Sequence, residues 1–403
     1  MHYFTFADKD TTVYQQSSSL NAGQDEVLEI RKDVSQTGTS INVSRILIHF
    51  PLEFISSSIV DGLIPGPGNN SAGSSSFYLN LFDAKSSKLV ASQSIYAYPV
   101  SQSWKLGGGR SYDNPVTIDG TSWTYRQGYL DCTLWDSSVS KSGATWYSGS
   151  GTTAVIGGVS DGDMRTKAGL EASFSFDSAK TEDVRMNVTD IVRWWLESTA
   201  SNEGFMVKRS GSILDKSAGT INASTDEGSS GSLGNFSFFS TDTHTKYPPT
   251  LETVWDDTIG KWACGSLSPI TGSDLEDMRI YMRGLRPEYT EKSKAKFRVI
   301  GRGRFPAKTY ATTPSTLEVK YLPSGSSYYS LVDAETNEVV VPYGSGSKLS
   351  CDSTGNYFNL WMDGYQPERY YKIEYRIRSG SGTVDEIDQY FDEEFTFKIN
   401  KQE

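Results

Sequence analysis

The fold class is decided by two neighbouring stretches, VLEIRKDV at residues 27–34 and VSRILIHF at residues 43–50. Both are short and alternate or run apolar, and a Ser-, Thr- and Gly-rich turn at 35–42 separates them, which is the pattern of two β-strands and their connection. The same pattern of short apolar or alternating stretches, separated by turn-forming residues, recurs along the chain. Further strands are expected at 77–83, 88–98, 170–177, 204–208, 235–240, 250–255 and 390–399.

The composition agrees with an all-β protein. The 403 residues include 37 Gly, 23 Tyr, 18 Phe and 9 Trp, against only 7 Met. Aromatic residues favour strands, and glycine favours tight turns. So many short strands in one span predict a jelly-roll-like sandwich for residues 1–255, and the chain length predicts two or three domains in all.

One helix is expected in this half, at 187–196 (NVTDIVRWWL), where Thr189 or Asp190 can cap its start. The apolar face of this helix, at helical spacing, is formed by Val188, Ile191, Trp194, Trp195 and Leu196. A Trp pair at this spacing more commonly belongs to a core than to a cofactor-stacking site. Segments too rich in Ser, Gly and Thr to build a core are interpreted as surface loops or extended arms: 56–76, 107–122, 137–168 and 209–234.

A module boundary is expected near residue 256. Beyond it, residues 280–289 (IYMRGLRPEY) are similar to residues 360–369 (LWMDGYQPER) at an offset of 80. An apolar strand, a Gly-x-x-Pro turn and a returning strand recur in immunoglobulin-like sandwiches, so this weak repeat predicts two immunoglobulin-like modules, 256–318 and 319–403. The alternative is shared turn chemistry without duplication.

Net charge limits the kinds of partner that the protein can bind, and cysteine usage indicates the redox compartment. The formal net charge is −11 and the pI is near 5.0, so repulsion from phosphates and anionic lipids argues against nucleic acid or membrane as a partner. No secretory signal and no membrane-spanning stretch is expected. The cysteines are odd in number and far apart, which favours a reducing compartment over a disulfide framework. They are interpreted as small buried or half-buried residues: Cys132, Cys264 and Cys351.

No motif for catalysis or for a cofactor is found, so the protein is expected not to be an enzyme. Asp8 with Asp10 and Asp161 with Asp163 can each offer oxygens to a structural Ca²⁺, but turn-forming Asp is the preferred interpretation. A glycoside hydrolase is kept as a third hypothesis, because 49 acidic residues make a facing carboxylate pair inevitable without identifying it. The histidines lie in unrelated contexts without metal-ligand spacing: His2, His49 and His244.

A basic strip alternates along an expected strand at 292–304. It is interpreted as one solvated sheet face or as an electrostatic contact with an acidic neighbouring subunit. Its members are Lys292, Lys294, Lys296, Arg298, Arg302 and Arg304.

Five motifs follow one another in the first 255 residues. They are ADKDTTV at 7–13 with NAG at 21–23, SRILIHF at 44–50, SW at 103–104 with TSWTYR at 121–126, VTDIVRWWL at 188–196 with NEGFMVK at 202–208, and PTLETVW at 249–255. In this order they resemble the DNRLRE family of β-sandwich domains, found in large extracellular, adhesin-like and carbohydrate-associated proteins. The long insertions and the missing signal argue against a free-standing secreted adhesin. The whole chain is similar in texture to virion structural proteins of marine T4-like phages.

These observations predict a non-enzymatic structural component of a tailed-phage virion, in the neck, tail or baseplate region. It is expected to assemble in the host cytoplasm and to act in the virion through contacts with other virion proteins, as a symmetric homo-oligomer. The alternative is a carbohydrate-binding, adhesin-type module whose aromatic rings stack on host glycans. The candidate glycan or interface residues are Trp104, Trp123, Tyr125, Trp135, Trp146 and Tyr147.

Overall fold

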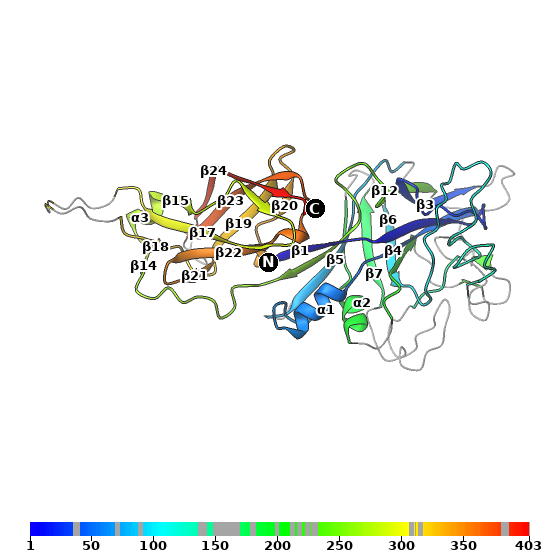
Figure 1. Ribbon diagram of the computed structural model, residues 1–403, viewed down its shortest axis with the longest axis horizontal. Helices are drawn as coiled ribbons and strands as arrows, with labels where there is room; N and C mark the ends of the chain where they lie inside the picture. The colour runs from blue at the N-terminus through cyan, green and yellow to red at the C-terminus, as the bar shows by residue number, and fades with distance from the viewer. Residues whose placement is uncertain are drawn as a thin grey trace. The chain divides into compact units, whose positions relative to one another are not determined.

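The computed structural model confirms the all-β sandwich class (Figure 1). The residues that it describes are 1–34, 41–68, 73–87, 92–135, 143–147, 170–177, 183–197, 201–209, 214–215, 220–221, 227, 233–305, 310, 312, 317–379 and 387–402. The chain divides into two compact units. The C-terminal unit contains Met1–Phe4, Ser71–Ser75 and Thr253–Glu403, and the N-terminal unit contains Thr5–Asn70 and Ser76–Glu252.

Two sheets account for most strands before residue 256. The larger has the order β12-β3-β4-β9-β6-β7, with β2 paired to β4, and the smaller has the order β1-β13-β5-β8. The strands expected from the sequence are present, with ends that differ by a few residues. Their bounds are β1 His2–Phe6, β2 Lys9–Tyr14, β3 Val27–Val34, β4 Ile41–His49, β5 Ser75–Leu81, β6 Ser92–Pro99, β7 Ala172–Asp177, β8 Val184–Asn187, β9 Phe205–Arg209, β12 Gly234–Phe239 and β13 Thr250–Trp255.

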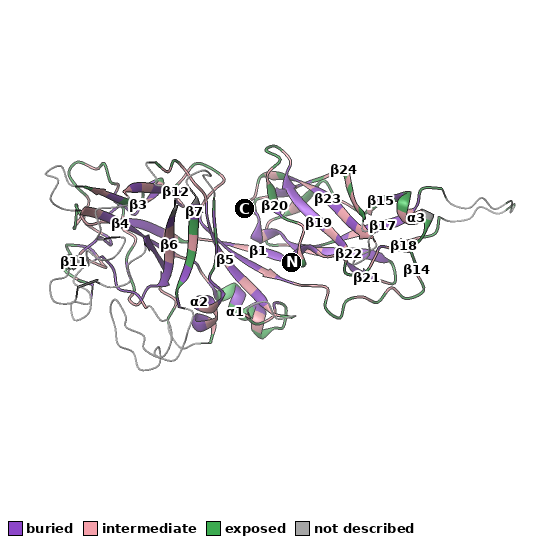
Figure 2. Cartoon of the chain, turned by 180° about the vertical axis from the view of Figure 1, so that it is seen from behind, coloured by how far each residue is buried: buried purple, intermediate pink, exposed green. Residues whose placement is uncertain are grey.

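Strand β4 is buried on both faces, and its centre is a run of apolar residues, Ile46–Ile48. Ile46 and Ile48 point to one side of the sheet and Leu47 to the other, and all three are 0% exposed. The Leu47 side is covered by tryptophans from the segment between β6 and β7. Figure 2 shows buried residues concentrated on the strands of each unit.

Two Asn-x-Gly motifs join distant segments of this unit through the same pattern of hydrogen bonds. The Asn21 amide donates to the carbonyl oxygens of Leu106 (2.7 Å) and Thr121 (2.9 Å), and its Oδ1 accepts from the Gly23 N–H. The Asn202 amide likewise donates to Phe50 O, and its Oδ1 accepts from the N–H two residues later. Each glycine allows a close backbone approach, because a Cβ on Gly23 would lie 2.3 Å from Leu106 O.

The expected helix is confirmed as α2 (Thr189–Leu196). Its Trp194 packs edge-on against Tyr147, with ring centroids 5.2 Å apart, so the Trp pair has the expected core role. The capping side chain is Asn187, whose Oδ1 accepts from the Thr189 N–H at 3.0 Å, instead of Thr189 or Asp190.

A second helix, α1 (Glu53–Val60), extends into the segment interpreted as a loop at 56–76 and corrects that interpretation. None of the described helices has the length and hydropathy to cross a membrane. Of the loop expected at 137–168, only 143–147 is described. The described parts of 209–234 are the ends of the neighbouring strands, the short β10 (Leu214–Asp215) and β11 (Thr220–Ile221), and Glu227.

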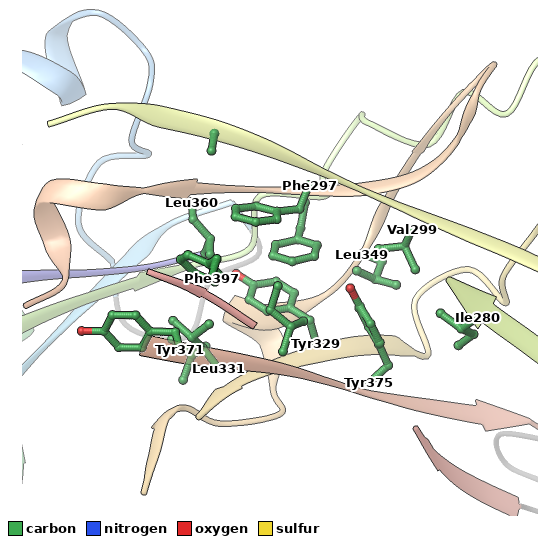
Figure 3. Packing of buried hydrophobic residues seen from close by; sticks show 14 of the residues in the cluster. Ile280, Phe297, Val299, Tyr329, Leu331, Leu349, Leu360, Tyr371, Tyr375 and Phe397 are labelled. Atoms are coloured by element: carbon green, nitrogen blue, oxygen red, sulfur yellow. The ribbon is translucent and has the colours of Figure 1, made fainter. Parts of the chain in front are cut away.

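The C-terminal unit is a sandwich of two sheets around one aromatic core (Figure 3). One sheet has the order β14-β18-β17-β22-β21 with β15 paired to β17, and the other has the order β16-β24-β23-β19-β20. The rings of Phe297, Tyr329 and Phe358 stack between them. The bounds are β14 Ser268–Pro269, α3 Ser273–Glu276, β15 Met278–Arg283, β16 Glu288–Thr290, β17 Lys294–Gly303, β18 Lys320–Tyr321, β19 Ser327–Asp333, β20 Val339–Val341, β21 Ser350–Asp352, β22 Gly355–Trp361, β23 Arg369–Ser379 and β24 Ile387–Asn400.

This pairing differs from the expected division at residue 318. β17 pairs with β22, and β16 pairs with β24, so strands from both sides of 318 share both sheets. The two similar stretches correspond to arches between the sheets, one from β15 to β16 and one from β22 to β23. Similar turn chemistry within one sandwich therefore explains the repeat.

Candidate functional site

The four tryptophans nominated as contact residues are buried. Trp104 and Trp123 are 4% exposed, and Trp135 and Trp146 are 0% exposed. They belong to one core cluster with Val13, Val43 and Leu47. A ring without an exposed face cannot stack on a sugar. For these four residues, core packing replaces the expected role as glycan or interface contacts.

The two nominated tyrosines are half-buried. Tyr125 packs edge-on against Tyr129, with ring centroids 5.4 Å apart, and Tyr129 is 49% exposed. Tyr147 packs on Trp194 of α2. The structure thus gives the two nominated tyrosines different ring neighbours, and Tyr125 with Tyr129 is the more accessible aromatic pair.

Beneath the tryptophans lies a buried ion triad of Arg45, Lys208 and Glu227. The register that pairs Ile46 with Val207 places Arg45 of β4 beside Lys208 of β9, so two cations are neighbours on one sheet face. Glu227 neutralises both: Arg45 Nε and Nη2 donate to its two oxygens at 3.0 and 2.9 Å, and Lys208 Nζ donates at 2.8 Å. No side chain of the triad is more than 2% exposed.

Burial and charge act against each other in this triad. Burial lowers the pKa of Lys208 to about 8, although the Glu227 carboxylate opposes the shift. Burial also acts to raise the pKa of Glu227, but the charges of Arg45 and Lys208 outweigh it and hold that pKa below its usual value. The Arg45 guanidinium lies 4.9 and 5.0 Å from the ring centroids of Trp123 and Trp146. The triad is sealed from solvent and its charges are compensated within the core, so it offers no open ligand position.

The proposed calcium ligands that are described have other partners. Asp10 is buried, and its carboxylate accepts from the Thr241 N–H (2.8 Å) and hydroxyl (3.1 Å). Asp8 contacts His49 Nδ1. Asp161 and Asp163 lie outside the described residues. Within the described ranges, no group of three or more His, Cys, Asp or Glu side chains is placed to hold a metal ion.

An exposed charged surface is found on the C-terminal sandwich. On β17 the alternate residues Ala295, Phe297 and Val299 point into the core, so the intervening cations point away from it. The same alternation on β15 turns Arg279, Tyr281 and Arg283 outward. We call this surface the arginine face: Arg279, Tyr281 and Arg283 on β15, and Lys294, Lys296, Arg298 and Arg302 on β17.

Like charges lie directly opposite one another on the arginine face. The β15–β17 register pairs Arg279 with Arg302 and Arg283 with Arg298. Opposed like charges destabilise a sheet unless something neutralises them. Among the described residues, the six cations form ion pairs with only two carboxylates, Asp352 and Glu393.

The composition of the arginine face is that of a protein interface. Arg and Tyr are enriched at interface cores, and Tyr281 is 40% exposed between the two arginine pairs. Sequence reasoning identified the β17 cations as a sheet face. It missed Arg279 and Arg283, because the register that places them opposite β17 is set by the fold.

The fold defines an all-β sandwich protein, and comparisons with known proteins add little to that class. No family model and no curated protein matches the chain. One matching solved structure is the FMN-binding beta-glucuronidase from Facaelibacterium prausnitzii L2-6, with 10% identity and a TM-score of 0.14. The match covers 95% of this chain and 39% of that chain. A TM-score this low does not show a shared fold, so it carries no argument about activity.

Proposed function

We propose that this chain is a non-enzymatic structural component of a tailed-phage virion, in the neck, tail or baseplate region. Its N-terminal unit is proposed to be a DNRLRE-type β-sandwich. In this role the chain assembles in the host cytoplasm and contacts other virion proteins, including further copies of itself. The observation that carries the proposal is the arginine face, which presents opposed cations on a chain of net charge −11.

The chemistry of that face specifies the partner. Arg283 and Arg302 have no carboxylate partner within the described part of the chain, so an acidic protein surface would supply what they lack. Arginine binds carboxylates through two parallel hydrogen bonds, which gives orientation as well as affinity. Tyr281 adds an apolar contact at the centre. A neighbouring subunit with carboxylates at matching spacing fits this face.

The first test places the chain on the particle. Virions purified from the phage that encodes the chain are labelled with an antibody to it and viewed by electron microscopy, and label at a fixed, symmetric position is expected. Purified particles that lack the chain would refute the proposal. A free monomer that binds glycans would instead support the carbohydrate-binding alternative, for which Tyr125 and Tyr129 are the accessible rings.

The second test addresses the arginine face. The double variant Arg283→Glu, Arg302→Glu changes two cations that form no ion pair among the described residues, so the fold is expected to survive. Its incorporation per particle, measured by quantitative mass spectrometry, is expected to fall at least tenfold. The charge-matched control is Lys85→Glu with Lys401→Glu, two exposed lysines that are not part of this face. Equal incorporation of both double variants would exclude the arginine face as the contact.

A further inference from the structure

Two cysteines that are far apart in the sequence lie side by side in the C-terminal unit. Cys351 is on β21, and its N–H donates to Lys261 O at 3.1 Å while its carbonyl accepts from the Ala263 N–H at 3.0 Å. These two bonds form a parallel bridge between Trp262 and Cys351. Residues 261–265 therefore run beside β21, with Cys264 next to the bridge.

A second contact fixes the far side of Cys264. A Cβ on Gly265 would lie 3.0 Å from Ser353 Cβ, so the chain on that side of Cys264 is packed against the residues that follow Cys351. The bridged residues Trp262 and Cys351 have Cα atoms about 5 Å apart. Three residues, from Trp262 to Gly265, run beside the two steps from Cys351 to Ser353, so Cys264 lies diagonally across from Cys351. That diagonal spacing approaches the upper end of the Cα separation of about 4.4–6.8 Å that a disulfide needs.

The two thiols are near enough to influence each other. Burial raises the pKa of the Cys351 thiol, and the neighbouring Cys264 thiol adds to that shift. Cys351 is 1% exposed, whereas Cys264 is half-buried. Cys132, in the N-terminal unit, is exposed, which corrects the expectation that all three cysteines are buried or half-buried.

We propose that Cys264 and Cys351 are a disulfide-forming pair, which closes when the chain meets a small-molecule disulfide. The Cys264 thiolate attacks the small disulfide, forms a mixed disulfide and releases one small thiol. The Cys351 thiolate then attacks the Cys264 sulfur and releases the second small thiol, so two cysteine thiols become one disulfide and the small disulfide is reduced to two thiols. The second step is slow at neutral pH, because burial disfavours the Cys351 thiolate.

The test uses the full chain, reduced and then incubated with oxidised glutathione at pH 8. Remaining thiols are alkylated and the unreduced tryptic digest is analysed by mass spectrometry. A Cys264–Cys351 cross-linked peptide is expected in the wild type and in Cys132→Ser, and it is expected to be absent from Cys264→Ser. The cross-link closes a long loop, so the melting temperature of the oxidised Cys132→Ser chain is expected to rise by roughly 5–10 °C over its reduced form.

Two outcomes would overturn the proposal. One is glutathione attached to both Cys264 and Cys351 without a cross-link. The other is a cross-link that forms only after addition of denaturant, because the two cysteines would then meet only in the unfolded chain and not in the native structure. Cys264→Ser changes the half-buried partner, so it is expected to fold even if substitution of the buried Cys351 prevents folding.

Discussion

Replacing Glu227 by Gln is expected to destabilise the N-terminal unit strongly. The substitution keeps the shape of the side chain and removes the charge that neutralises Arg45 and Lys208, each of which is 0% exposed. Breaking a buried ion pair by changing one partner costs about 3–5 kcal/mol, because the other charge stays buried without compensation. For a unit of this size, that cost corresponds to a fall in melting temperature of roughly 6–20 °C.

The pH dependence of the loss identifies its cause. The native pKa of Lys208 is lowered to about 8, below its value in the unfolded chain. Above pH 8 the unfolded state therefore binds more protons than the native state, and the contribution of Lys208 to the free energy of unfolding increases with pH. Without Glu227, that native pKa falls further. Between pH 7 and pH 8 the variant then gains up to about 1.4 kcal/mol per pH unit, which is more than the wild type gains while its Lys208 is still largely protonated. The difference between the two proteins is expected to shrink over this range.

The assay is urea unfolding of the full chain, followed by tryptophan fluorescence at pH 7 and pH 8. The matched control is Glu252→Gln, since Glu252 is also buried but its partner Arg185 has a side chain 47% exposed. Water can solvate Arg185 after the change, so the control is expected to lose about 1 kcal/mol or less. Equal losses in the two variants would show that the triad is not the source of the stability.

Two further substitutions in the same unit test other contacts. Burial raises the pKa of Asp10 to about 7, so the native state holds a proton that the unfolded chain releases above about pH 4, and the contribution of Asp10 to stability is expected to fall as pH rises from 4 to 7. The melting temperature of the wild type relative to that of Asp10→Asn is therefore expected to fall over this range, and a constant difference would contradict the assignment. Gly204→Ala is expected to cost more than about 2 kcal/mol in urea unfolding, because φ is +90° and the new Cβ would lie 2.3 Å from Ile48 O. The control Gly62→Ala also has a positive φ but no atom within 4 Å, so it is expected to cost about 1 kcal/mol, and equal losses would exclude the close approach as the cause.

The strands could be predicted because their signal is local. Alternating apolar residues at 27–34 are sufficient to identify β3, whatever its partners are. Helix α1 could not be predicted in the same way. Its sequence EFISSSIV contains three serines, and its N-cap Leu52 makes no side-chain cap bond, so the local preference for a helix is weak. Burial of Ile55 in the tertiary structure supports the helix instead.

The candidate sites depend on contacts that no local pattern records. Trp135 and Trp146 are the residue type of an exposed aromatic platform, yet the segment that carries them packs on the Leu47 face of β4. Glu227 lies in a segment interpreted as a surface loop, and its partners come from β4 and β9. The basic strip of β17 was recognised by its alternation, but the opposing Arg279 and Arg283 require the register of β15.

The two sets of neighbouring cations show what the arginine face requires of a partner. In the N-terminal unit, Arg45 and Lys208 are neighbours and are tolerated in the core because Glu227 binds both. On β15 and β17 one arginine of each opposed pair is bound to a carboxylate, Arg279 to Glu393 and Arg298 to Asp352, and like charges in contact with water cost only a few tenths of a kcal/mol. An interface would remove that water, so Arg283 and Arg302 would then need carboxylates, as Arg45 and Lys208 do. A neutral partner would therefore be rejected, and binding to an acidic one would weaken as salt is added.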